Sequence, residues 1–179
     1  MCWIKTQTEL IKCRRRVMAL EERIAVLEAM LDQTMPPDPP EIYKAVSNKY
    51  IWAAFAEIFP EYMRHVYISD AQYKVCHISD IRRFVEWSNV NVFPYQREWH
   101  DCDDFAFALV GEFSKYPEWS AYPVALIWSS WGKDVYHAYV CVVAMDDDGV
   151  PRVYYIEPQN DWEIARESVE GQELCLLVI

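Results

Sequence analysis

The sequence lacks the marks of several protein classes. No segment approaches the roughly 18 consecutive apolar residues that a membrane-spanning helix needs. The N-terminus lacks the charged and then apolar layout of a secretory signal. The six cysteines are scattered without a Cys-x-x-Cys pair, which argues against both a disulfide framework and a structural zinc site. We therefore expect a cytoplasmic protein that does not insert into a membrane.

Basic side chains are scarce beyond residue 34. The first 34 residues hold six of the 17 Lys and Arg and five of the 28 Asp and Glu, so eleven basic and 23 acidic side chains remain, a net charge of −12. Phosphate backbones and anionic membrane surfaces would repel such a domain. We expect neither a nucleic-acid partner nor a membrane partner.

Residues 3–31 carry apolar side chains in a seven-residue repeat, the pattern of a coiled coil. In the same frame, the g-to-e′ pairs bring opposite charges together when the helices run parallel. We expect self-association as a parallel dimer or trimer; the alternative is an amphipathic helix folded onto its own domain. The repeat places Trp3, Leu10, Val17, Ile24 and Leu31 at a, and Thr6, Cys13, Leu20 and Leu27 at d.

The segment from Met35 to Glu41 is rich in proline and cannot continue a helix. The sequence thus predicts a coiled-coil oligomerisation helix over 1–34, a Pro-rich linker over 35–41 and one compact domain over 42–179. Within that domain, helical patterns come first and β-rich runs follow, which predicts an α+β fold with helices packed on an antiparallel sheet. The helical patterns span 41–59 and 79–88, and the β-rich runs span 124–128, 136–145, 152–157 and 173–179.

A thiol stands at the predicted start of a further helix. Asp101 is a good N-cap and Asp104 completes a capping-box pattern, so Cys102 falls in the first turn of a helix that reaches about Phe113. The helix dipole favours a thiolate there by only about 0.3–1 kcal/mol. Lowering a thiol pKa from about 8.5 to 7 takes roughly 2 kcal/mol, so a cationic partner such as an imidazolium is needed.

The aspartates around Cys102 oppose ionisation of the thiol. One carboxylate about 7 Å away costs a thiolate on the order of 2 kcal/mol at an effective dielectric constant near 20. A bound hard cation would offset this repulsion and would also fix the loop. We therefore consider Ca²⁺ a candidate cofactor, with Asp101 and Asp104 as its candidate ligands.

His137 and Glu157 lie on two consecutive predicted strands that are joined by an Asp-rich turn. If Gly149 is the left-handed residue of a three-residue loop, Glu157 lies one diagonal step from His137 on the same face. A loop over 146–148 would put the two residues directly opposite each other, and a four-residue loop would put them on opposite faces. A lone strand histidine is more often a half-buried residue bonded to backbone. Together with Cys102, however, the pair favours a Cys-His-Glu triad.

A hydrolase of this kind also needs a donor for the oxyanion. Gln96 precedes Cys102 by six residues and is the candidate, with an ordinary polar loop residue as the alternative. His100 is close enough along the chain to be a rival base.

Three short motifs resemble one protein family. The motifs are Asp101–Ala106 (DCDDFA), His137–Ala138 and Ile156–Gln159 (IEPQ). They are similar to the papain-like cysteine protease domain of the fairy-ring mushroom (Marasmius oreades) agglutinin and of its bacterial and phage relatives. The resemblance covers roughly residues 65–165, lacks the Cys-Gly-x-Cys-Trp stretch of papain, and has no sugar-binding repeat before it.

The resemblance implies a papain-like fold and a thiol protease activity. It implies Cys102 as the nucleophile, His137 as the general base and Glu157 as the residue that orients the imidazole. In the fungal relative the activity depends on calcium, for which Asp101 and Asp104 would be the local ligands. The phage relatives and the coiled coil also fit a phage-encoded or virion-associated protein.

The sequence therefore predicts a self-associating cysteine hydrolase that acts on a peptide or another amide substrate. The alternatives are an acyl transferase of the transglutaminase type and a non-catalytic structural or adhesion protein. In the structural protein, the coiled coil would be the functional part.

Overall fold

We describe residues 12, 14–18, 20–21, 23–24 and 35–179 in a computed structural model of the chain. The chain divides into two compact units, Met1–Pro36 and Pro37–Ile179. In the first unit the described residues from 12 to 24 are helical, and the heptad residues Val17, Leu20 and Ile24 are exposed. The remaining heptad positions lie outside the described residues, so the coiled coil stays a prediction.

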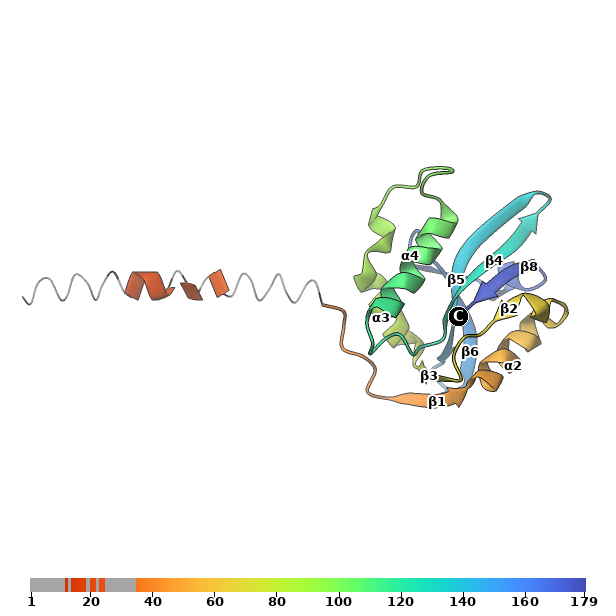
Figure 1. The fold of residues 1–179 in the computed structure, drawn as a ribbon, viewed down its shortest axis with the longest axis horizontal. Coiled ribbons are helices and arrows are strands. Elements are labelled where there is room, and N and C mark those ends of the chain that lie inside the picture. The colour runs from red at the N-terminus through yellow and green to blue at the C-terminus, as the bar shows by residue number, and fades with distance from the viewer. Residues whose placement is uncertain (1–11, 13, 19, 22, 25–34) are drawn as a thin grey trace, which may run out of the picture. The chain divides into compact units, whose positions relative to one another are not determined.

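The second unit has an α+β fold, as the sequence predicted (Figure 1). A six-stranded sheet has the order β2-β8-β4-β5-β6-β7, and every pairing in it is antiparallel except β2 with β8. A separate two-stranded sheet pairs β1 with β3. The strands are β1 (Tyr43–Ser47), β2 (Val66–Tyr67), β3 (Gln72–Cys76), β4 (Val124–Gly132), β5 (Val135–Met145), β6 (Pro151–Glu157), β7 (Trp162–Ile164) and β8 (Glu173–Val178).

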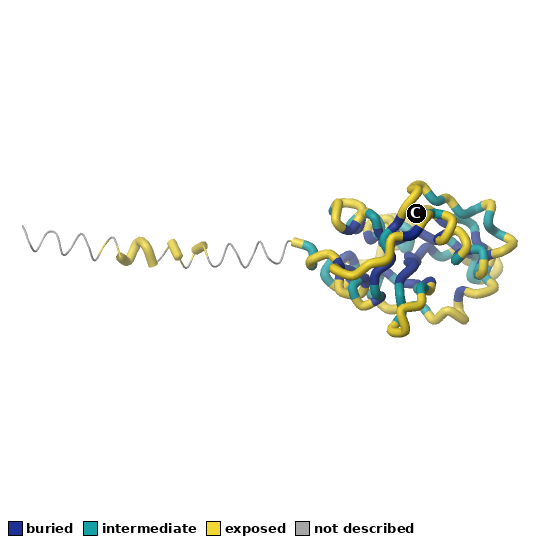
Figure 2. Tube along the Cα trace, turned by 90° about the horizontal axis from the view of Figure 1, so that it is seen from below, coloured by how far each residue is buried: buried dark blue, intermediate teal, exposed yellow. Residues whose placement is uncertain are grey.

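Helices cover both faces of the larger sheet. The helical elements are α2 (Asn48–Ile58), η1 (Pro60–His65), α3 (Ile78–Ser88), η2 (Val90–Val92), α4 (Cys102–Lys115) and α5 (Arg166–Val169). In β5, Ala138 and Val140 pack in the core with α3 and α4, whereas Tyr139 and Cys141 pack in the core with α2. This alternation follows from the period of two along a strand. In Figure 2 the buried residues of this unit lie in its interior.

Aromatic side chains dominate the core on the α4 face. Phe84 is fully buried and stacks on Phe113 with the ring centroids 4.0 Å apart. Its ring also contacts Trp87, Tyr116 and Trp119. This cluster fixes the last turn of α4 against α3.

The globular unit begins earlier than the sequence indicates. The indole N–H of Trp119 donates to the Pro37 carbonyl at 3.0 Å, and Arg83 donates to the Asp38 carbonyl at 2.9 Å. These bonds attach the second half of the predicted linker to the helical layer. The unit therefore starts at Pro37, before the predicted domain start at residue 42.

The predicted helix over 41–59 is only partly correct. Residues Tyr43–Ser47 form strand β1, because their backbone groups pair with β3, and helix α2 begins at Asn48. The predicted start of α4 at Cys102 is correct. Helix α3 begins at Ile78, before the predicted residue 79, because His77 caps it and the His77 ring accepts from the Ser79 amide. Among the described residues, none of the helices has the length and apolarity that crossing a bilayer requires.

Candidate functional site

The start of α4 holds the thiol in the predicted position. Asp101 caps the helix through a capping box, in which the Asp104 carboxylate accepts from the Asp101 amide at 3.1 Å. The Asp101 carboxylate also accepts from the Glu98 amide at 3.1 Å. Cys102 is half-buried in the first turn, packs against the α4-face core and hydrogen-bonds the backbone of Ala138 in β5. The predicted cap is confirmed.

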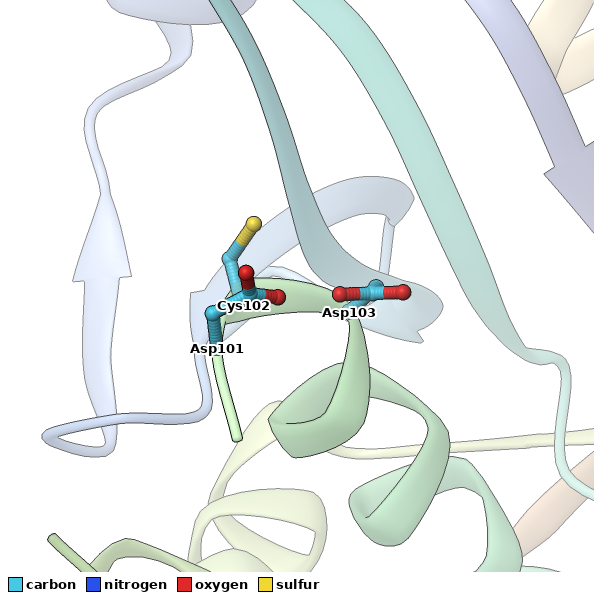
Figure 3. A group of neighbouring side chains, drawn as sticks. All are labelled: Asp101, Cys102 and Asp103. Atoms are coloured by element: carbon cyan, nitrogen blue, oxygen red, sulfur yellow. The ribbon is translucent and has the colours of Figure 1, made fainter. Parts of the chain in front are cut away.

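Asp101, Cys102 and Asp103 form a compact group (Figure 3). One ligand atom from each residue lies within 4.8 Å of the others. A hydrogen bond between the two carboxyl groups lowers the pKa of Asp101 and raises the pKa of Asp103. The carboxyl group beside Asp101 is thus that of Asp103, whereas the carboxylate of Asp104, the predicted partner, is engaged with backbone. The capping-box pattern in the sequence already indicated that the Asp104 carboxylate would accept a backbone hydrogen bond.

The surroundings of Cys102 favour the protonated thiol. Burial raises its pKa most, and the nearby carboxylates of Asp101 and Asp103 raise it further, while the hydrogen bond with the Ala138 backbone lowers it. The predicted opposition between these aspartates and a thiolate is confirmed. A cation or an imidazolium would be required to activate the sulfur.

His137 and Glu157 form a short, largely buried pair. His137 Nε2 lies 2.6 Å from Glu157 Oε2, and their side chains are 20% and 16% exposed. The other oxygen of Glu157 accepts from the backbone amide and side-chain amide of Gln159, each at 3.2 Å. The ring of His137 stacks on Tyr139 and meets Trp131 edge to face. Glu157, Trp131 and Tyr139 thus hold the imidazole from three sides. The sequence analysis did not predict the contacts of Trp131 and Tyr139, although Tyr139 shares the strand face of His137.

The hairpin between β5 and β6 has the register expected for a three-residue loop with a left-handed Gly149. Gly149 has a φ of 73°, and the Asp146 amide donates to the Val150 carbonyl at 2.9 Å. Val140 pairs with Ile156, which places Glu157 one diagonal step from His137. The predicted three-residue loop is confirmed.

The thiol of Cys102 in α4 lies against Ala138 of β5, the residue next to His137. Cys102 contacts the backbone of Ala138 on the α4 face, and His137 is the next residue along the strand. The His137 ring stacks on Tyr139, which belongs to the core on the opposite face. Among the described residues, Nδ1 of His137 has no hydrogen-bond partner, and no hydrogen bond joins it to Cys102 Sγ. The structure thus joins His137 and Glu157 directly and places Cys102 against the residue next to His137.

The predicted oxyanion donor and the rival base lie in the loop before α4. Gln96 and His100 pair through two backbone hydrogen bonds of 2.8 and 2.7 Å, and Gln96 is exposed. The ring of His100 packs on Phe105 at 4.4 Å, and its Nε2 is buried without a partner. This packing ties His100 to the core, whereas Gln96 is available on the surface near the start of α4.

Comparison with known proteins identifies similar folds. No protein-family model matches the chain, and no curated protein is significantly similar to it. The Polyporus squamosus lectin, solved with the human-type influenza-binding epitope Neu5Acα2-6Galβ1-4GlcNAc, has a TM-score of 0.62 and 22% identity over 75% of this chain and 49% of that chain. A complex of PSL1a with E64 has the same TM-score and identity, over 75% of this chain and 50% of that chain.

The chain therefore spans about half the length of the two solved chains. At 22% identity, the likeness extends to the fold alone.

Proposed function

We propose that this protein is a papain-like cysteine hydrolase that acts on peptide or other amide bonds. The observation that supports this most is the hydrogen bond between His137 and Glu157. It leaves Nδ1 of His137 open, and the next residue, Ala138, contacts Cys102. In this proposal Glu157 accepts the Nε2 proton, which leaves Nδ1 as the proton acceptor for the thiol. Catalytic hydrogen bonds in unliganded enzymes are often long and shorten when substrate binds.

The proposed reaction has two stages. Cys102 Sγ attacks the carbonyl carbon, His137 gives the thiol proton to the leaving amine, and a thioester remains on Cys102. Water then attacks the thioester with His137 as the base, which releases the acid and restores the thiol. The Cys102 amide at the start of α4 and the side chain of Gln96 are the proposed donors to the oxyanion.

Selective alkylation of Cys102 tests this function. E64 is the bound compound in one of the similar structures, and its epoxide reacts with thiolates. We expect a single E64 adduct on Cys102 and none on Cys76, Cys141 or Cys175. Cys76 and Cys141 are buried, and in the proposed reaction Cys102 is the thiol that gives its proton to His137. Mass spectrometry of the labelled peptides measures this.

The Cys102→Ala variant is the control and should take up no E64. Equal labelling of several cysteines, or none, would contradict the hydrolase and favour the structural or adhesion protein. If Cys102 reacts selectively, incorporation of an added amine into the product, in place of net hydrolysis, would favour the transglutaminase-type reaction.

We propose Ca²⁺ as an activating ion at Asp101 and Asp103. The two carboxyl groups are hydrogen-bonded to each other, and a divalent cation could take the place of that bond between hard oxygen ligands. When bound, the ion would neutralise the charge that raises the pKa of Cys102. Asp104 would support the site by capping α4 and not as a direct ligand.

Chelation should therefore slow the reaction of Cys102. We expect a chelator to lower the second-order rate of E64 alkylation at pH 7 by about tenfold, which corresponds to one pKa unit. The Asp103→Asn variant should abolish the response to the chelator, whereas Asp134→Asn, a change on the exposed β4–β5 turn, should keep it. If a chelator leaves the rate of E64 alkylation of the unmodified protein unchanged, the ion has no part in the mechanism.

We also propose that residues 3–31 form a parallel coiled coil. The heptad repeat and the exposure of Val17, Leu20 and Ile24 in the single chain support this. The molar mass of the full chain in solution measures the oligomeric state.

A further inference from the structure

A cavity of about 440 Å³ lies between helix α3 and the β6–β7 edge of the larger sheet. Its apolar lining comes from Val85 of α3, Ile156 of β6 and Trp162 of β7. Ile156 belongs to the same buried core as Ala138, and Cys102 packs against that core. The cavity therefore lies on the face of the sheet that carries the proposed nucleophile, one residue along β6 from Glu157.

The charged lining of this cavity is acidic. Arg82 and Glu163 form an ion pair with each other, with Arg82 Nε 2.5 Å from Glu163 Oε1. This pair neutralises its own charges. The carboxylates of Glu86 and Asp161 also line the cavity, and no cationic side chain pairs with either of them among the described residues. The remaining field in the cavity favours a cation.

Asp161 is held in a position that penalises its ionised form. Oδ2 accepts from Asn91 at 2.6 Å, and Oδ1 is buried without a partner. Burial and the nearby Glu86 raise the pKa of Asp161 to about 6, against an ordinary value of 3.8. The folded state thus holds the proton more tightly than the unfolded chain, so stability falls as the pH rises from about 4 to about 6.

An asparagine would avoid this penalty at Asp161. The residue has a φ of 60°, a left-handed conformation that asparagine adopts as readily as aspartate. The charge is therefore unfavourable for the free protein at neutral pH, and a cation beside it would remove the penalty. The turn that carries Asp161 also carries Glu157, since the Asp161 amide donates to the Glu157 carbonyl at 2.9 Å.

We propose that this cavity binds the side chain of a lysine or arginine in the peptide substrate. The aliphatic stem would pack on Val85 and Ile156, and the cationic head would lie near Glu86 and Asp161. Trp162 is 73% exposed and offers a ring face to the same head. The identification of the ligand as a substrate side chain rests on the proposed hydrolase.

Binding to an inactive full-length protein tests the cavity without hydrolysis. Calorimetry on the Cys102→Ala chain would compare Nα-acetyl-arginine amide with Nα-acetyl-citrulline amide, which has the same shape without the charge. We expect the arginine compound to bind at least tenfold more tightly at pH 7.5. Glu86→Gln or Asp161→Asn should remove most of this difference, and Glu118→Gln, an exposed charge change after α4, should retain it. Equal affinity of the two compounds, no binding of either, or an equal loss in Glu118→Gln would overturn the proposal.

A stability measurement separates a binding role from a folding defect. Asp161→Asn should melt several degrees higher than the unmodified protein at pH 8 and lose that gain at pH 4, where the native carboxyl group is protonated. Weaker arginine binding together with higher stability supports the cavity as a cation site. Weaker binding together with lower stability at pH 8 would mean that the substitution disrupted the turn, and would count against it.

Hydrolysis then distinguishes failure of this proposal from failure of the proposed function. If the unmodified protein cleaves matched arginine and citrulline peptides equally well, the hydrolase stands and the cation pocket falls. If the pocket discriminates between the two amides while Cys102 does not react with E64, the pocket stands and the hydrolase falls.

Discussion

Replacing His137 with alanine should lower kcat/KM for amide hydrolysis by roughly 10²–10⁴-fold, the usual contribution of a positioned general base. The variant loses the proton acceptor for Cys102 and leaves the Glu157 carboxylate without its 2.6 Å partner. Glu157→Gln should lower the rate less, because the glutamine keeps one oxygen to hold the ring but cannot stabilise the imidazolium. Steady-state hydrolysis and the rate of E64 alkylation measure both variants.

A second histidine in the same domain gives a matched control. His77 also pairs with a carboxylate, at 3.1 Å from Asp147, but it caps α3 away from the proposed site. His77→Ala should keep the activity within a few-fold. A normal rate in His137→Ala, or a loss confined to His100→Ala, would assign the base to another residue and contradict the triad.

Replacing Phe84 with alanine should destabilise the domain by about 3–5 kcal/mol, as expected for removal of a buried aromatic ring. Phe84 is fully buried and its ring contacts four aromatic side chains of the core that fixes α4 on α3: Trp87, Phe113, Tyr116 and Trp119. The cavity left by the ring cannot close without moving both helices. The midpoint and slope of urea unfolding measure the change.

Phe107 provides the comparison for this substitution. It lies on α4 and is 57% exposed, so Phe107→Ala should change the free energy of unfolding by less than about 1 kcal/mol. A similar loss in both variants would mean that the aromatic cluster does not determine stability. Because the cluster positions α4, Phe84→Ala should also reduce the selectivity of Cys102 labelling.

Local signals in the sequence predicted much of the site. The capping residues Asp101 and Asp104 predicted the start of α4, and a left-handed Gly149 was one of the loop geometries considered for the register that places Glu157 beside His137. Both features are set by backbone geometry within a few residues, so the amino-acid pattern is sufficient to predict them.

Features that depend on distant segments were not predicted. Strand β1 forms where a helix was expected, because its hydrogen bonds go to β3 and not to its own turn. The Asp101 carboxyl group pairs with Asp103, because the carboxylate of Asp104 is bonded to the Asp101 amide. The proposed cation-binding cavity needs α3 beside β7, elements that are far apart in the sequence. The papain-like reaction stays a prediction of the motifs, because the structural similarity extends to the fold alone.

The bond from Trp119 to the Pro37 carbonyl determines where an isolated domain can be cut. A shortened chain that begins at residue 42 would lose the acceptor of the Trp119 indole N–H and the segment that covers it, and the lost hydrogen bond alone would cost about 0.5–1.5 kcal/mol. Truncation at or before Pro37 preserves this contact, so recombinant fragments and limited digestion should both yield their sturdiest product there.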